Sequence, residues 1–77
     1  MKEEIRKLIA DTLGAPMQQI GDNTEIGELE NWDSIHQLMI ISELEEKYHL
    51  HFSEDDIFDM TSVGDIIEVT QKRIGNP

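Results

Sequence analysis

Ser34 is the residue of this chain whose type and position best suit covalent chemistry. It follows Asp33 where a long loop meets an amphipathic helix expected at about residues 33–48. The free N–H groups and the positive end of the dipole at a helix N-terminus favour a bound phosphate. The sequence therefore predicts a phosphate-compatible site at Ser34. The simpler interpretation is that the serine only caps the helix, since Asp and Ser are both common there.

The other groups that could support catalysis are poorly arranged for it. His36 is two residues from Ser34, and side chains at that spacing on a helix do not face each other, which disfavours a Ser-His-Asp triad. His36, His49 and His51 are not spaced as helical zinc ligands, and the chain has no cysteine. No glycine-rich phosphate loop is present. We therefore expect no catalytic residues and no metal site, and predict that the protein is not an enzyme.

Charge is the strongest signal in the composition. The 77 residues carry 17 acidic and 6 basic side chains, for a formal net charge of -11. Such a surface repels nucleic acid and anionic membranes, and it favours partners with basic patches. Without cysteine, any thiol chemistry must use a thiol supplied from elsewhere. We expect one domain spanning residues 1–77, a monomer, and a cytoplasmic location, since residues 1–4 do not begin a secretory signal.

Apolar periodicity predicts an all-α fold: a small four-helix bundle of three main helices and one short helix. A long loop at residues 15–32 separates the first two helices, and such a loop is uncommon unless it is functional or carries a short helical turn. Residues 49–52 alternate in polarity, but we expect an extended linker that buries Leu50 and Phe52. Ser53 and Ser62 are expected to cap the last two helices. The predicted helices span about residues 2–13, 33–48, 54–59 and 63–74.

Several apolar residues outside the main helices are expected to join the core. Ile26 and Leu29 are predicted to anchor the long loop, and the single tryptophan, Trp32, to pack the loop against the helices rather than contact a ligand. The short helix is expected to bury both Ile57 and Phe58.

The helix at 33–48 carries more apolar residues than one core stripe needs. An arc of about 100° forms the ordinary core face, with Ile40, Ile41, Leu44 and Tyr48. A second flank combines apolar residues with carboxylates, as surfaces that meet partners do. This flank holds Ser34, Ile35, Leu38, Met39 and Ser42, together with Glu45 and Glu46.

Three segments together resemble the acyl carrier protein family. They are Asp33-Ser34-Ile35, the helix end Leu44-Glu45-Glu46-Lys47-Tyr48, and Thr61-Ser62-Val63-Gly64-Asp65-Ile66. The tripeptide alone is a weak signal, but the combination is specific, and the resemblance covers nearly the whole chain with the helices in the expected order.

The resemblance implies a carrier of acyl groups rather than a catalyst. In the family, the serine at the position of Ser34 receives 4′-phosphopantetheine from coenzyme A, and the terminal thiol of that arm holds an acyl group as a thioester. Asp33 would help the phosphopantetheinyl transferase recognise the site. Acyl-loading, acyl-transferring and condensing enzymes with basic docking patches would be the other partners. The implied docking face comprises Ile35, Leu38 and Met39 at its centre, with Glu43, Glu45 and Glu46 meeting basic residues.

Differences from the family pattern indicate a specialised carrier rather than the housekeeping one of fatty-acid synthesis. Many members have Gly at the position of Asn31 and Leu at that of Ile35, and the loop at residues 28–32 resembles more divergent carriers. Carriers in fatty-acid, lipid or polyketide biosynthesis and peptidyl or aminoacyl carriers all remain open. The alternatives from other classes are an acidic helical inhibitor or interaction module with an unmodified Ser34 and, last, a minimal hydrolase.

Overall fold

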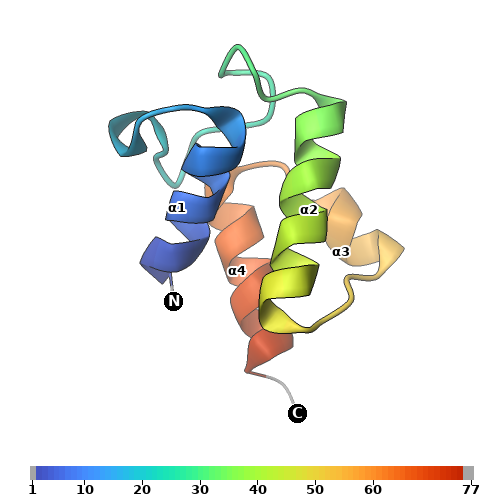
Figure 1. The fold of residues 1–77 in the computed structure, drawn as a ribbon. Coiled ribbons are helices and arrows are strands. Elements are labelled where there is room, and N and C mark those ends of the chain that lie inside the picture. The colour runs from blue at the N-terminus through green and yellow to red at the C-terminus, as the bar shows by residue number, and fades with distance from the viewer. Residues whose placement is uncertain (1, 76–77) are drawn as a thin grey trace.

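The computed structural model describes residues 2–75 and contains no strand within them. Figure 1 shows the helices and the long loop that joins the first two main ones. The predicted all-α fold with three main helices, one short helix and a long first loop is confirmed. A short 3₁₀ turn, η1, interrupts the loop. The elements are α1 (Lys2–Leu13), η1 (Met17–Gln19), α2 (Ser34–Tyr48), α3 (Glu54–Asp59) and α4 (Val63–Ile74).

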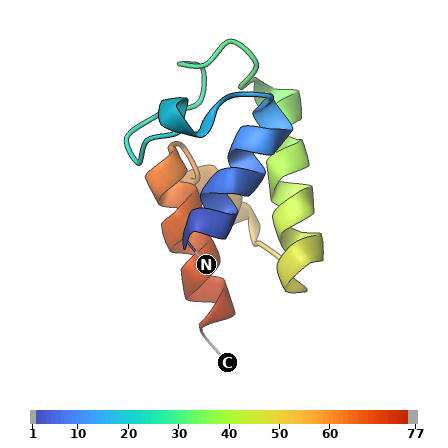
Figure 2. The ribbon, with the colours of Figure 1, turned by 60° about the vertical axis from the view of Figure 1, so that its left-hand side comes forward.

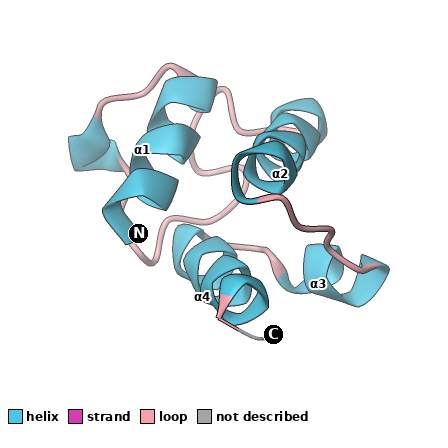
Figure 3. Ribbon diagram, turned by 60° about the horizontal axis from the view of Figure 1, so that its bottom comes forward, coloured by secondary structure: helices cyan, strands magenta, loops and turns pink. Residues whose placement is uncertain are grey.

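Helices α1, α2 and α4 surround one core, and α3 lies on the side between α2 and α4 (Figure 3). The predicted core face of α2 is confirmed, because Ile40, Ile41 and Leu44 are buried and Tyr48 is partly buried against the core. None of the helices within residues 2–75 is both long enough and apolar enough to cross a bilayer. The buried apolar side chains are Ile5, Ile9, Ala10, Leu13, Ile20, Trp32, Ile40, Ile41, Leu44, Phe52, Met60, Val63, Ile66 and Ile67.

Backbone hydrogen bonds attach the long loop to the start of α4. The N–H of Ile26 donates to the carbonyl of Thr61 at 3.0 Å, and the N–H of Gly64 donates to that of Asp22 at 2.8 Å. The loop passes so close to Gly64 that a Cβ there would lie 2.9 Å from the Asp22 carbonyl oxygen. Figure 2 shows the loop crossing the end of the bundle where α2 and α4 begin.

The predicted apolar anchors of this loop are partly wrong. Leu29 packs against the core as expected, but the Ile26 side chain is 37% exposed. Ile26 holds the loop through the hydrogen bond of its backbone N–H to the carbonyl of Thr61 and not through burial of its side chain. Ile20, which sequence reasoning did not single out, is the buried residue instead.

The second half of the chain follows the predicted caps but differs at one side chain. Ser53 accepts from the N–H of Asp56 in a capping box, and Ser62 caps α4. Phe52 is buried and Leu50 is partly buried, as expected. Phe58, however, is 83% exposed, so its predicted burial is wrong. A helix of six residues turns only one narrow face to the core, and in α3 this face is occupied by Ile57, the residue before Phe58.

Candidate functional site

Ser34 is the first residue of α2, and its side chain is exposed. The N-cap is Asp33, whose carboxylate oxygen Oδ1 accepts from the backbone N–H of His36 at 2.9 Å. Within residues 2–75, no hydrogen bond involves the Ser34 hydroxyl. The structure thus assigns the capping role to Asp33 and leaves the hydroxyl of Ser34 accessible at the N-terminus of a 15-residue helix.

The electrostatics at this end of α2 suit a phosphodiester on Ser34. The first turn of α2 contains no acidic residue, and its N–H groups present the positive end of the helix dipole. The nearest carboxylate, on Asp33, is engaged with His36. The backbone N–H of His36, followed by its ring, lowers the pKa of Asp33 below the ordinary value. An exposed hydroxyl with no competing partner is compatible with 4′-phosphopantetheine as a covalent substituent.

His36 is oriented toward Asp33. Its ring nitrogen Nδ1 lies 2.8 Å from Asp33 Oδ1. A serine nucleophile needs a base within hydrogen-bond reach, and the ring of His36 is instead paired with the N-cap carboxylate. In the described part of the chain, no cluster of three or more His, Cys, Asp or Glu side chains is arranged to hold a metal ion.

An apolar groove on the outer face of α2 begins next to Ser34. We call it the α2 groove; it has a volume of about 360 Å³ and is lined by Ile35, Leu38, Met39, Ser42 and Glu43. The first three side chains are 68%, 60% and 45% exposed, which are large values for apolar residues. Glu43 does not belong to the flank predicted from helical periodicity and was implied only by the resemblance, yet it lines the groove. Its carboxylate also accepts a hydrogen bond from Thr12 of α1.

The remaining two predicted docking carboxylates differ in their surroundings. Glu46 is exposed, but Glu45 turns toward the linker after α2. Its carboxylate accepts from the backbone N–H of Phe52 at 2.9 Å and lies 3.3 Å from His51 Nδ1. Glu45 therefore holds the linker in place and does not line the α2 groove.

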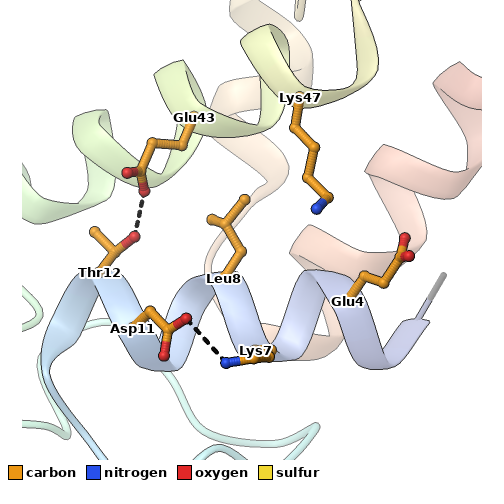
Figure 4. Close-up of a pocket in the computed structure, with 7 residues that line it drawn as sticks. All are labelled: Glu4, Lys7, Leu8, Asp11, Thr12, Glu43 and Lys47. Atoms are coloured by element: carbon orange, nitrogen blue, oxygen red, sulfur yellow. Dashed lines mark hydrogen bonds and ion pairs between the residues drawn. The ribbon is translucent and has the colours of Figure 1, made fainter.

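A second groove, between α1 and α2, lies farther along α2 (Figure 4). It measures about 380 Å³, and its lining carries charges of both signs, including an ion pair of 3.3 Å between Lys7 and Asp11. Its α2 residues, Glu43 and Lys47, come from the second half of the helix. This groove does not adjoin Ser34.

A buried amide that sequence reasoning missed lies one turn below Ser34. The side-chain oxygen of Gln37 accepts from Trp32 Nε1 at 2.7 Å, and its nitrogen donates to the carbonyl of Met60 at 3.0 Å. Trp32 packs in the core, as predicted. The spacing of Gln37 from Ile40 and Ile41 places it on the core face of α2, which is the signal that could have identified it.

Comparisons with known proteins agree with this geometry. The family model described as "Phosphopantetheine attachment site" matches residues 3–69. An acyl carrier protein of Chlamydia trachomatis is 32% identical over 73 residues, which cover 95% of each chain. One from Chlamydia caviae is 29% identical over 75 residues, covering 97% of each chain. The polyketide-8 synthase acyl carrier protein 2 of Streptomyces avermitilis is 28% identical over 75 residues, covering 97% of this chain and 86% of that one.

The helical fold, the accessible serine at the start of α2 and the family match define a carrier domain with a phosphopantetheine attachment site. The chain belongs to the acyl carrier protein family. Proteins of this family are carriers and not catalysts, so this chain is an acyl or polyketide carrier whose prosthetic group is 4′-phosphopantetheine. The family works with a phosphopantetheinyl transferase and with enzymes of fatty-acid or polyketide synthesis.

Proposed function

We propose that Ser34 is the residue to which 4′-phosphopantetheine is attached, through a phosphodiester to its hydroxyl. The observation that carries this proposal is that the hydroxyl is exposed at the first position of α2, while Asp33 serves as the cap. The helix N-terminus stabilises the negative charge of the phosphodiester. When bound, the group supplies the thiol that holds an acyl cargo as a thioester, which the chain itself, without cysteine, does not have.

We propose that Asp33 is recognised by the transferase in addition to capping α2. Its carboxylate stands immediately before Ser34, and its Oδ1 is fixed by the N–H and ring of His36. This fixed, exposed negative charge gives a basic transferase a point of recognition beside the hydroxyl that it modifies.

The α2 groove is proposed as the docking surface for the enzymes that load, transfer or condense the cargo. Its apolar centre of Ile35, Leu38 and Met39 is contiguous with Ser34, so a bound enzyme lies beside the attachment point. Glu43 and Glu46 extend the surface with negative charge that complements basic docking patches. Glu45 is proposed to add the least, because Phe52 and His51 already engage its carboxylate.

The attachment is tested by incubating the protein with coenzyme A and a broad-specificity transferase and measuring intact mass. We expect one phosphopantetheinyl group per wild-type chain, mapped to Ser34 by peptide fragmentation, and none on Ser34→Ala. Alanine is a better helix former than serine, and the cap at Asp33 is unchanged, so the variant keeps the fold by circular dichroism. A wild-type protein left unmodified by several transferases, or a modified Ser34→Ala protein, would contradict the proposal.

Asp33→Asn separates transferase recognition from helix capping. Asparagine caps helices about as well as aspartate, so the melting temperature should change little. The loss of the negative charge is expected to lower kcat/KM of the transferase severalfold without changing the final extent of modification. Equal kcat/KM for Asp33→Asn and wild type would show that the carboxylate of Asp33 is not recognised.

Three further expectations from the sequence remain proposals: a single domain at residues 1–77, a monomeric state and a cytoplasmic location. The net charge of -11 favours proteins with basic surfaces as partners over nucleic acid or anionic membranes. Light scattering of the purified protein and fractionation of its own cells test the oligomeric state and the location.

A further inference from the structure

The interior of the bundle is closed directly beneath Ser34. Gln37 is the first buried side chain of α2, with only 7% of its surface exposed. Because Trp32 Nε1 only donates and the Met60 carbonyl only accepts, the two partners determine which end of the Gln37 amide faces each of them. The amide thus joins the loop before α2, α2 itself and the C-cap of α3.

The other way into the core from this end, between α1 and α2, is also bridged. The side-chain nitrogen of Asn31 donates to the Leu13 carbonyl at the end of α1, at 3.0 Å. The adjacent Trp32 is 1% exposed, and its indole fills the space between the loop and the core. Polar bonds and a large aromatic side chain therefore close both sides of α2 at the level of Ser34.

These bonds oppose the insertion of an acyl chain. A chain passing between α2 and α3 would separate Gln37 from Trp32 or from Met60, and leave buried polar groups without partners. A long apolar cargo that cannot be buried by its carrier stays in contact with water, which is unfavourable. A short or polar cargo gains little from burial, so it does not need an open interior.

We infer that this carrier keeps its cargo outside the helical bundle, and that short or polar acyl groups are the class of cargo it carries. The inference rests on the proposed attachment at Ser34. The Trp32–Gln37–Met60 bonds are the feature that excludes a longer apolar chain from the core.

The test is independent of any transferase. Ser34→Cys introduces a single thiol into a chain that has none, so a thiol-reactive linker of phosphopantetheine length can be attached there uniquely. Two linkers are compared, one ending in a methyl group and the other in an octyl group. A failure of enzymatic modification at Ser34 would refute the attachment proposal without affecting this comparison.

We expect the two labelled proteins to melt at the same temperature. The indole N–H of Trp32, the single indole in the chain, should keep the same NMR shift and the same protection from hydrogen exchange in both. An octyl form that melts several degrees above the methyl form would overturn the inference, and so would an indole signal that shifts or loses protection only in the octyl form.

A second variant tests whether Gln37 is the closing residue. In the Ser34→Cys, Gln37→Ala protein the amide is gone and space opens beneath position 34, so the octyl form should melt several degrees above the methyl form. No difference between the two forms would overturn the role assigned to Gln37. Gln37→Asn, one methylene shorter, allows the same comparison if Gln37→Ala does not fold.

Discussion

Gln37→Leu is the substitution that most directly measures the contribution of the buried amide to stability. It removes two hydrogen bonds and leaves Trp32 Nε1 and the Met60 carbonyl without partners in the core. Each unsatisfied buried group costs about 1–3 kcal/mol, and the added apolar burial returns about 1 kcal/mol. The expected loss in the free energy of unfolding is therefore about 3 kcal/mol.

This loss is large for so small a domain, whose total stability is on the order of 3–5 kcal/mol. It corresponds to a fall in melting temperature of about 12–24 °C at this chain length. Thermal unfolding is followed by circular dichroism and by the fluorescence of Trp32, which lies within the perturbed network. Both probes should report the same transition if unfolding is two-state.

Trp32→Phe provides the matched control, because it removes the indole donor and leaves Gln37 in place. Since the two residues share one hydrogen bond, the double variant should lose less stability than the sum of the two single variants. If Gln37→Leu melts at nearly the wild-type temperature, or if the two losses simply add, the reasoning from unsatisfied buried groups is refuted for this site.

Two further predictions concern the loop and α3. Gly64→Ala gains up to about 1 kcal/mol of helix propensity. However, it sets a Cβ 2.9 Å from the Asp22 carbonyl oxygen, and this clash costs about 1–3 kcal/mol. Urea unfolding should therefore show a net destabilisation of about 1 kcal/mol. An unchanged or raised urea midpoint would show that the loop moves away freely. Arg73 lowers the pKa of Asp56 to about 2 from 3.8, so the carboxylate's stabilisation is fully present above pH 3.8 and is lost as the pH falls through about 2. The free energies of unfolding of wild type and Asp56→Asn, measured in urea, should therefore differ at pH 5 and converge as the pH falls from 3.8 to about 2. A difference that stays constant over this pH range would contradict the role given to the Asp56–Arg73 pair.

The sequence by itself determined the helical elements and the place of the proposed attachment site at Ser34. Helix bounds follow from apolar spacing and from caps within three residues of the first turn, such as Ser53 with Asp56. The position of Ser34 at the start of α2 is likewise a local property, since it depends on Asp33 and on the N–H groups of the first turn. Such short-range interactions can be read directly from neighbouring residues.

Only the tertiary structure decided how residues distant in sequence pair with one another. Gln37 is buried because Met60, 23 residues away, supplies a carbonyl for its amide. Glu45 turns from the predicted docking face because the linker brings the N–H of Phe52 within its reach. Phe58 is exposed because α3 presents only one narrow face to the core. Periodicity indicates which face of a helix is apolar, but it does not indicate what the rest of the chain brings against that face.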